Sequence, residues 1–278
     1  MAKKKRNRKK SIRQRALVDI VVLVYDVFDL AQQCVDAIPE AFREVPWHLI
    51  IMDNGSEDRE RAMEFFRQFN GNSSVTVVRS QSNIGFPRGN NVAARKGDAP
   101  LLFLLNSDCI LAPGSGDILV RAMDDPLVGI AGMKLVFPED SSDRTRPPGK
   151  VQHVGLMTGI RGQQKHIFIG WSPDHPKVNA VREVDAVTGA ALMVRRSLWR
   201  RAGGFYEGYG KGTWEDVDLC YAVRKMEYKV VVETQAVGTH HVGQSAIAHG
   251  EAFPLLQNEL LFRQRHGDFM KYSEWRVL

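Results

Sequence analysis

The stretch LLFLLNSDCI, residues 101–110, places five apolar residues directly before the polar residues Asn106, Ser107 and Asp108. A short, continuous apolar run is typical of a strand that is covered on both faces, as in a parallel sheet. Runs of the same kind predict further strands at Val18–Tyr25, Trp47–Met52, Ser74–Val78 and Val128–Val136. Between these strands, apolar residues at helical spacing predict helices at Phe28–Ile38, Glu57–Phe69 and Arg88–Lys96. This alternation predicts an α/β fold with a mostly parallel central sheet flanked by helices.

The second half of the chain is less regular. Pro138–Lys150 is rich in turn-forming residues and predicts a loop, and Arg161–Arg182 predicts an irregular insertion. Further strands are expected near Val187–Val194 and at Lys229–Val232, with helices starting at Ser197 and Glu215. Residues 251–278 have helical spacing and predict a C-terminal helical extension that packs back on the domain.

The positive charge is concentrated at the N-terminus. The chain has 278 residues and a formal net charge of +6, but nine of its 38 Lys and Arg residues lie within residues 1–15, which contain no acid. The other 29 basic residues are outnumbered by 32 acidic ones. Residues 1–16 therefore predict a disordered basic tail, because this segment repels itself and has little to bury. Such a tail could contact an anionic membrane face or a nucleic acid, or serve only for solubility.

Three features predict that the protein is located in the reducing cytoplasm. If the tail binds an anionic surface, the protein would be peripheral to that surface. No apolar segment with a cleavage site follows the tail, so we do not expect a secretory signal peptide. The longest apolar runs, Ile20–Tyr25 and Leu101–Leu105, are far shorter than the roughly 20 residues of a membrane span. The three cysteines (Cys34, Cys109 and Cys220) are odd in number and lack metal-ligand spacing.

Carboxylates follow three of the first four predicted strands, as Asp26, Asp53 and Asp108. The carboxyl ends of parallel strands share one edge of a sheet, where ligands bind in open α/β folds. Three acidic groups at this edge would repel each other unless a cation lies among them, and Mg²⁺ or Mn²⁺ prefers such oxygen ligands together with substrate phosphates. Capping of the following helices is the competing interpretation, strong for Asp53 and weaker for Asp108.

Several blocks of sequence, taken in order, resemble one known family. They are DIVVLVYD, LIIMDNGSED, NIGFPRGNNVA, LLFLLNSDCIL, VTGAALMVRRSLW, GGFYEGYGKGTWEDVDLCYAVRK and HHVGQS. Together they resemble the family 2 glycosyltransferases with the GT-A fold, and especially their rhamnosyltransferase-like branch. The resemblance implies inverting transfer of a sugar from a nucleotide-diphosphate donor, with Mn²⁺ or Mg²⁺ as cofactor and a UDP- or dTDP-sugar as the favoured donor. It also implies a GT-A domain over residues 17–250, with a nucleotide-binding half (1–135) and an acceptor and catalytic half (183–250).

The roles of the family carry over by position. Asp108 and His240 match the metal ligands, Asp216 matches the catalytic base with Glu215 beside it, and Trp214 is a candidate acceptor platform. The donor nucleotide and sugar are assigned to Tyr25, Asp26, Asp53, Asn54, Asn83, Arg88, Asn106, Ser107 and Gly189.

The chain departs from the family pattern at two places. Asp26 replaces a frequent Asn and adds negative charge near the nucleotide. The metal motif opens with Asn106, so only Asp108 offers a carboxylate there. His240 is preferred over His241 as a ligand from the spacing H-x-x-G-x-S, although the adjacent histidines leave this choice open.

The residues also allow other interpretations. Acidic residues favour the first turn of a helix, which accounts for WEDVD without catalysis. A dinucleotide-dependent oxidoreductase is disfavoured, since YDVFDLAQQC after the first strand lacks the G-x-G-x-x-G pattern. A catalytically inactive sugar-nucleotide-binding protein is a further alternative. The acceptor stays open between a glycan, a lipid-linked glycan, a protein and a nucleic acid bound through the basic tail, as does the oligomeric state.

Overall fold

The computed structural model describes residues 16–159, 163–250, 252–271 and 276–277. The predicted basic tail, up to residue 15, lies outside these residues. The helices are α1 (Phe28–Ala41), α2 (Arg59–Arg67), α3 (Phe86–Ala94), α4 (Ser115–Ala122), α5 (Arg196–Ala202), α6 (Glu215–Arg224), α7 (Gln244–Ala248) and α8 (Leu255–His266), with 3₁₀ turns η1 (Glu207–Tyr209) and η2 (Gly267–Phe269). The strands are β1 (Val18–Val24), β2 (Trp47–Asp53), β3 (Val75–Arg79), β4 (Leu101–Asn106), β5 (Cys109–Leu111), β6 (Val128–Val136), β7 (Val151–His153), β8 (Leu156–Thr158), β9 (Gln164–His166), β10 (Arg182–Glu183), β11 (Ala191–Arg195), β12 (Lys229–His240) and β13 (Arg276–Val277).

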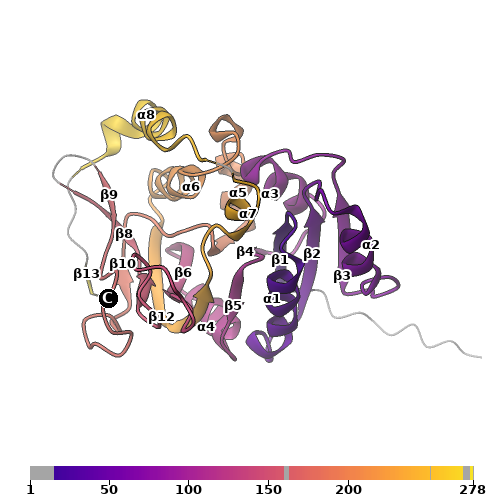
Figure 1. Ribbon diagram of the computed structural model, residues 1–278. Coiled ribbons are helices and arrows are strands. Elements are labelled where there is room, and N and C mark those ends of the chain that lie inside the picture. Colours follow the sequence, from indigo (N-terminus) through magenta and orange to yellow (C-terminus); the bar gives the residue numbers. More distant parts are fainter. Residues whose placement is uncertain (1–15, 160–162, 251, 272–275, 278) are drawn as a thin grey trace, which may run out of the picture.

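One large sheet forms the centre of the molecule (Figure 1). Its strand order is β13-β10-β12-β6-β11-β4-β1-β2-β3, with β5 paired to β12 and β7 to β6. The strands β3, β2, β1, β4, β6 and β12 all run in one direction, and β11 runs antiparallel between β4 and β6. The expected α/β fold with a mostly parallel sheet is confirmed.

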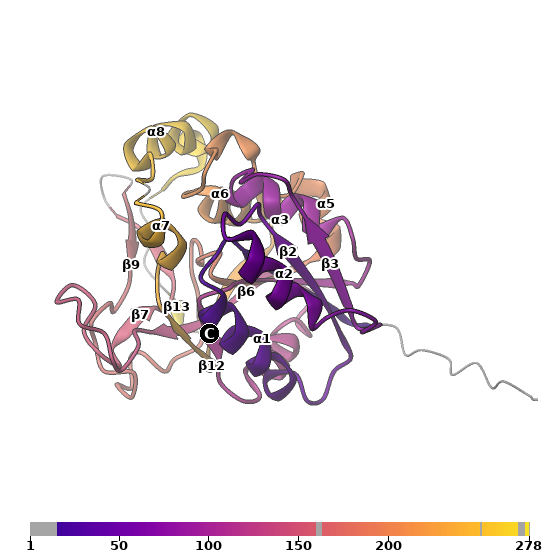
Figure 2. The same cartoon turned by 45° about the vertical axis from the view of Figure 1, so that its right-hand side comes forward.

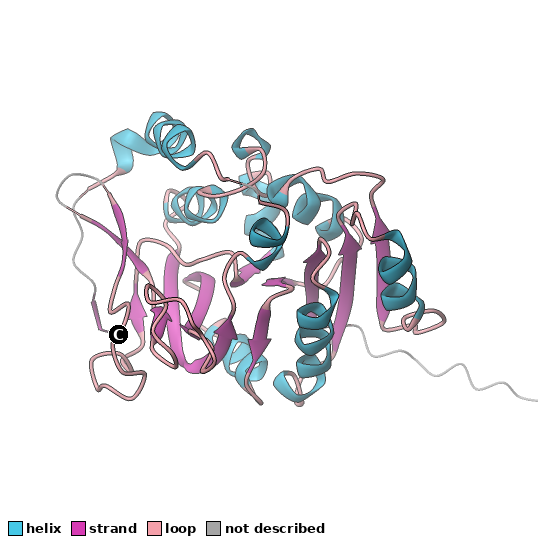
Figure 3. Ribbon diagram, in the orientation of Figure 1, coloured by secondary structure: helices cyan, strands magenta, loops and turns pink. Residues whose placement is uncertain are grey.

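Helices cover both faces of this sheet, which explains the continuous apolar strands (Figure 3). Ile20, Val22 and Val24 pack with α1, α2 and α4 on one face, whereas Val21 packs on the opposite face with α3, α5 and α6. Successive strand residues point to opposite faces, so a strand buried on both sides is mostly apolar; Asp19 of β1 is buried as the partner of Arg196.

Several boundaries differ from the expectations. Helix α3 begins at Phe86 instead of Arg88, because Gly85 turns the chain at φ 86° and Pro87 occupies the first helical turn. The strand expected near Val187–Val194 is shorter and begins at Ala191, since residues 187–190 form a loop at the sheet edge. The segment expected to be irregular contains β9, which pairs with β8 in a hairpin.

The C-terminal segment packs on the α6 side of the sheet. Figures 1 and 2 both show α8 beside α6, at the opposite end from α1 and α4. The chain then returns to the large sheet, where β13 pairs with β10, so the expected helical extension ends in a strand. No helix among the described residues is long and apolar enough to cross a bilayer.

Candidate active site

A cavity of about 300 Å³ opens at the carboxyl ends of β1, β2 and β4, between the loop after β11, the start of α6 and helix α7. Nine of the residues expected at the site line it: Tyr25, Asn54, Asn83, Asn106, Ser107, Asp108, Gly189, Glu215 and Asp216. Sequence positions almost 200 residues apart therefore meet in one place, because parallel strands bring their carboxyl ends to the same edge.

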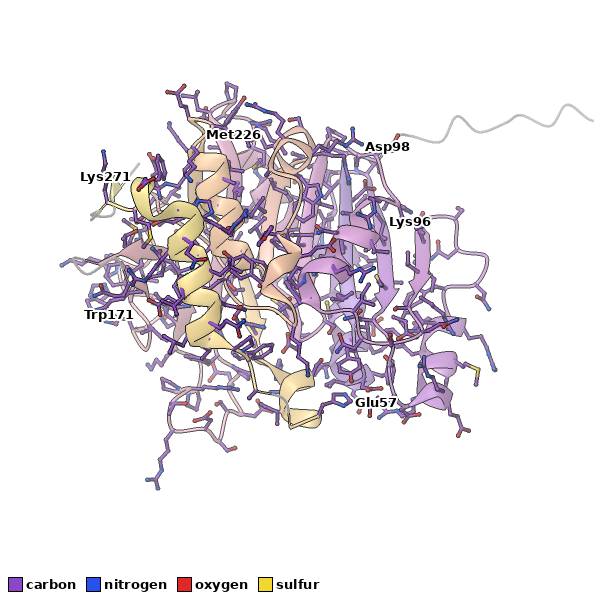
Figure 4. The ribbon with its side chains drawn as sticks, turned by 90° about the horizontal axis from the view of Figure 1, so that it is seen from above. Glu57, Lys96, Asp98, Trp171, Met226 and Lys271 are labelled. Carbon is purple, nitrogen blue, oxygen red and sulfur yellow. The ribbon has the colours of Figure 1, made fainter. Side chains whose placement is uncertain are left out.

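Two asparagines and a tyrosine form one end of the cavity. Asn54 donates from Nδ2 to Oδ1 of Asn83 at 3.0 Å, and its own Oδ1 accepts the Ile84 amide at 3.3 Å. The ring of Tyr25 stacks on His249, with ring centroids 4.2 Å apart. His249 follows α7. The sequence around His249 does not predict a contact with a residue more than 200 positions away, so this histidine was not expected at the site. Figure 4 shows α7 close to the labelled Glu57, whose carboxylate lies 3.8 Å from Nδ1 of His249.

The first two strand-end carboxylates do not line this cavity. Asp26 accepts the backbone amides of Glu57 and Asp58 at 3.1 and 3.2 Å and lies 2.9 Å from Nε2 of His249. Asp53 is buried and accepts the amide of Ser56 at 2.8 Å. Both carboxylates therefore accept amides of the turn after β2. Helix α2 is capped by Asp58, which accepts the Arg61 amide at 3.0 Å, so the helix capping that the sequence left open for Asp53 is not observed.

Asp108 and His240 meet because β12 pairs antiparallel with β5, which places His240 opposite Cys109. Nε2 of His240 lies 3.2 Å from Oδ1 of Asp108. Its Nδ1 lies 2.8 Å from the amide oxygen of Gln152, which can only accept. In the neutral imidazole, Nδ1 therefore carries the proton and the lone pair of Nε2 faces Asp108. His241 does not share this contact and instead donates its backbone amide to the Asp108 carbonyl at 2.9 Å.

This arrangement fits a divalent cation held by mixed oxygen and nitrogen donors. Burial disfavours the charged carboxylate, but a positive charge on His240, which requires a proton on Nε2, and the Gln244 amide hold the pKa of Asp108 below its ordinary value. Oδ1 of Asn106 is buried without a hydrogen-bond partner among the described residues, as expected of an oxygen that awaits a cation. No group of three His, Cys, Asp or Glu side chains gathers in the described part of the chain, so a diphosphate would complete the coordination.

Two carboxyl groups open helix α6 on the other side of the cavity. Asp216 accepts the Gly189 amide at 2.7 Å, and a Cβ at position 189 would lie 3.3 Å from Cβ of Asp216. Burial raises the pKa of Asp216, and burial together with the charge of Asp216 raises the pKa of Glu215 well above its ordinary value. Oε2 of Glu215 is buried and has no partner among the described residues, which suits a protonated carboxyl. Of the two carboxyl groups, Glu215 therefore has the stronger reason to stay protonated.

Three other expected residues lie outside the cavity lining: Arg88, Trp214 and His240, which contacts Asp108. The Arg88 side chain is 61 % exposed, with its guanidinium 3.9 Å from Glu207. Trp214 packs on Phe262 of α8, with ring centroids 5.0 Å apart, so this tryptophan contributes to packing.

The structure adds residues that the sequence did not single out. Lys211 is the only cationic side chain among the described residues that line the cavity, and it comes from the Gly-rich turn before α6. Phe86, Gln244 and Phe253 line it as well. The quoted blocks contain three of these residues, but only the fold shows that they face the cavity.

Comparison with known proteins identifies the chain. Residues 19–201 match the family described as "Glycosyl transferase family 2". The chain belongs to this family. The family match ends at residue 201, so Glu215, Asp216, His240 and helix α8 all lie beyond it.

Named relatives of this family 2 member are 28–29 % identical to it. They include "Uncharacterized protein y4gI" of Sinorhizobium fredii (28 % identity, 94 % of this chain and 28 % of the relative) and "O-antigen biosynthesis protein RfbC" of Myxococcus xanthus (29 %, 87 % and 18 %). "N-acetylglucosaminyl-diphospho-decaprenol L-rhamnosyltransferase" of Mycobacterium tuberculosis is 28 % identical over 73 % of this chain and 69 % of its own length. The chain spans less than a third of the first two relatives.

Solved structures share the GT-A fold of this family 2 member. The structure titled "GalNAc-T7 with UDP, GalNAc and Mn2+" superimposes with a TM-score of 0.68 at 14 % identity, over 90 % of this chain and 48 % of the other. Mannosyltransferase PcManGT from Pyrobaculum calidifontis, "in complex with GDP-Man and Mn2+", gives 0.57 at 17 % identity, over 90 % and 71 %. The expected family and fold are therefore confirmed.

Proposed function

We propose that this protein transfers a sugar from a nucleotide-diphosphate donor to an acceptor hydroxyl with inversion at the anomeric carbon. The observation that carries the proposal is one cavity shared by Asp108, next to His240, and by Asp216 of α6. These groups match the two requirements of the reaction, since the leaving diphosphate needs positive charge and the acceptor hydroxyl must lose a proton.

In this proposal Asp216 accepts the proton of the acceptor hydroxyl. The acceptor oxygen then forms a bond to the anomeric carbon while the bond from that carbon to the diphosphate oxygen breaks. The raised pKa of Asp216 suits a base that works near neutral pH, and the neutral Glu215 beside it leaves a single carboxylate for the task. One base and one direct displacement lead to inversion.

Asp108, His240 and Asn106 would hold a divalent cation, which supplies charge to the leaving diphosphate. The imidazole favours Mn²⁺ over Mg²⁺, because Mg²⁺ is bound almost entirely by oxygen. Both solved neighbours are complexes with Mn²⁺, which supports the same choice here. Tyr25, Asn54 and Asn83 lie where the nucleoside of a UDP- or dTDP-sugar is expected, and Lys211 replaces Arg88 as the cation that faces the diphosphate.

The acceptor is proposed from the relatives alone. One is named for O-antigen biosynthesis and another for rhamnosyl transfer to a diphospho-decaprenol, so we favour a glycan or lipid-linked glycan and a deoxyhexose such as rhamnose. The three cysteines are free and buried, which fits a reducing, cytoplasmic compartment. Residues 1–15 would bring the protein to an anionic surface that carries the acceptor.

Calorimetric titration with UDP, GDP and dTDP, each with and without Mn²⁺, tests this proposal. We expect one of the three nucleotides to bind only when Mn²⁺ is present. In Asp108→Ala this Mn²⁺-dependent binding should be lost. Asp36→Ala, which removes an exposed carboxylate from α1, serves as the matched control and should bind like the wild type. Failure of all three nucleotides to bind would refute the proposal. Binding without any release of nucleotide from the corresponding sugar donor would favour the catalytically inactive alternative.

A further inference from the structure

The loop that leads into α6 has an unusual backbone. Thr213 and Trp214 have φ values of 77° and 73°, and both immediately precede Glu215. Residues other than glycine rarely adopt this left-handed backbone conformation. Two such residues in succession keep it only where the surrounding structure holds them. The orientation of the first turn of α6, which carries Asp216, therefore depends on whatever fixes this loop.

Asn258 of helix α8 is placed to do so. Its side chain is only 3 % exposed, and its Nδ2 lies within hydrogen-bond distance of the carbonyl oxygens of Tyr209, Gly212 and Thr213, at 3.1, 2.8 and 3.2 Å. The Thr213 hydroxyl oxygen is a fourth acceptor at 3.2 Å. An amide has two N–H groups, so one buried side chain can bind two points of the loop at once.

Helix α8 is in turn fixed to α6. Asp218 of α6 accepts hydrogen bonds from Nε of Arg265 at 2.6 Å and from the Tyr209 hydroxyl at 3.0 Å, and its Oδ1 lies 2.8 Å from Nε2 of His266. Figure 4 shows α8 lying along the same side of the molecule as α6. The loop also contacts the start of α3, where the Phe86 amide donates to the Lys211 carbonyl oxygen at 3.1 Å and Gly85 lies close to the Gly210 carbonyl oxygen.

We propose that Asn258 is a positioning residue, which holds residues 209–214 in their strained conformation and thereby aims the Asp216 carboxylate at the acceptor. The catalytic part of this inference rests on the proposed function, whereas the part that concerns the loop does not. Because the family match ends at residue 201, this hold comes from a part of the chain that the family pattern does not describe.

The test compares Asn258→Ala with two controls. Gln257→Ala removes an exposed amide one residue away, and Leu261→Ala weakens the packing of α8 on the core but leaves Asn258 in place. Three quantities are measured: the rate of trypsin cleavage after the exposed Lys211, the rate of nucleotide release from the sugar donor in excess Mn²⁺, and the Kd of the nucleotide diphosphate. Asn258→Ser keeps one donor and carries the test if the alanine variant does not fold.

We expect Asn258→Ala to raise cleavage after Lys211 at least about fivefold and to lower the rate of nucleotide release at least about tenfold, because small displacements of a reacting group are costly. The Kd of the nucleotide diphosphate should change less than the rate, since Lys211 is the one residue of the loop proposed to face the diphosphate and the other donor contacts come from other elements. Asn258→Ser should be intermediate, and both controls should match the wild type in all three measurements.

Unchanged cleavage in Asn258→Ala would overturn the inference. An equal increase in cleavage in Leu261→Ala would also overturn it, because it would show only a general loss of stability. Increased cleavage with an unchanged rate of nucleotide release would refute the link to Asp216. If the wild-type protein binds no nucleotide, the proposed function fails and the catalytic part of the inference fails with it, but the cleavage comparison still decides whether Asn258 holds the loop.

Discussion

Replacing Glu215 by glutamine tests whether one of the two carboxyl groups at the start of α6 is neutral in the folded protein. Glu215 is 4 % exposed, and burial together with Asp216 raises its pKa well above 4.5. Its Oε2 has no partner among the described residues, so no hydrogen bond is lost when an amide takes its place. Glutamine has the shape of the protonated acid but cannot ionise, which isolates the effect of the proton.

The expected effect follows from the proton that the folded state retains. Below about pH 4.5 Glu215 is protonated in both the folded and the unfolded protein, and its contribution to the free energy of unfolding is complete. As the pH rises toward the raised pKa, only the unfolded chain releases this proton, so the contribution is lost. The loss is about 1.4 kcal/mol for each pH unit inside that window. The free energy of unfolding of Glu215→Gln, minus that of the wild type, should therefore increase with pH above about 4.5, by about 1.4 kcal/mol for each pH unit between the unfolded and the raised folded pKa.

Urea unfolding of both proteins, followed by tryptophan fluorescence at several pH values, measures this difference. Glu60→Gln on the exposed side of α2 is the control, and its curve should run parallel to that of the wild type. Parallel curves for Glu215→Gln would refute the reasoning. They would mean that Glu215 is ionised in the folded state, and Asp216 would then lose its distinction as the single base.

Three further substitutions probe the site and the fold. Gln152→Ala removes the acceptor that orients His240, and calorimetry should show Mn²⁺ affinity roughly 10- to 100-fold weaker, as is usual for the partners of metal ligands. Asp216→Asn should lower the rate of nucleotide release by about 10²- to 10⁴-fold in a steady-state assay, because the general base is lost, while the Kd of the nucleotide stays within about twofold. Asp19→Ala leaves the buried Arg196 without its carboxylate, now 2.5 Å away, and should lower the free energy of unfolding in urea by about 3–5 kcal/mol.

For each of these substitutions, one outcome would contradict the prediction. Unchanged Mn²⁺ affinity in Gln152→Ala would exclude His240 as an oriented ligand. Equal loss of binding and rate in Asp216→Asn would indicate a structural role for that residue. The exposed Asp36→Ala should stay within about 0.5 kcal/mol of the wild type, and a similar value for Asp19→Ala would show that the ion pair near the start of β1 contributes little.

The strands were predicted well because their signal is local. β6 spans Val128–Val136 as expected, and β1 and β4 each differ by one residue at the end. A strand buried on both faces is mostly apolar, with Asp19 of β1 as an exception that is paired with Arg196, so its sequence alone reveals it. The loop before β11 was mistaken for strand because Ala190 and its neighbours are also small and apolar, yet they line a cavity.

The contacts that organise the site were harder to foresee. The partners of His240 and Asp216 are Gln152 and the Gly189 amide, at sequence separations of 88 and 27 residues. No periodicity relates such positions, and only the pairing of strands and the packing of helices bring them together. The resemblance to the family named Asp108, His240 and Asp216, but it could not show that Asp26 and Asp53 serve the turn after β2.

The dependence of the loop on α8 has a consequence for building hybrid enzymes. The loop of residues 209–214 contacts the cavity through Lys211 and is an obvious segment to exchange when a different acceptor is wanted. If the loop alone were moved into a related protein, Asn258 would be missing. Thr213 and Trp214 would then relax to ordinary backbone angles. The smallest transferable unit therefore runs from the end of α5 through α8, so that a loop and the helix that supports it are exchanged together.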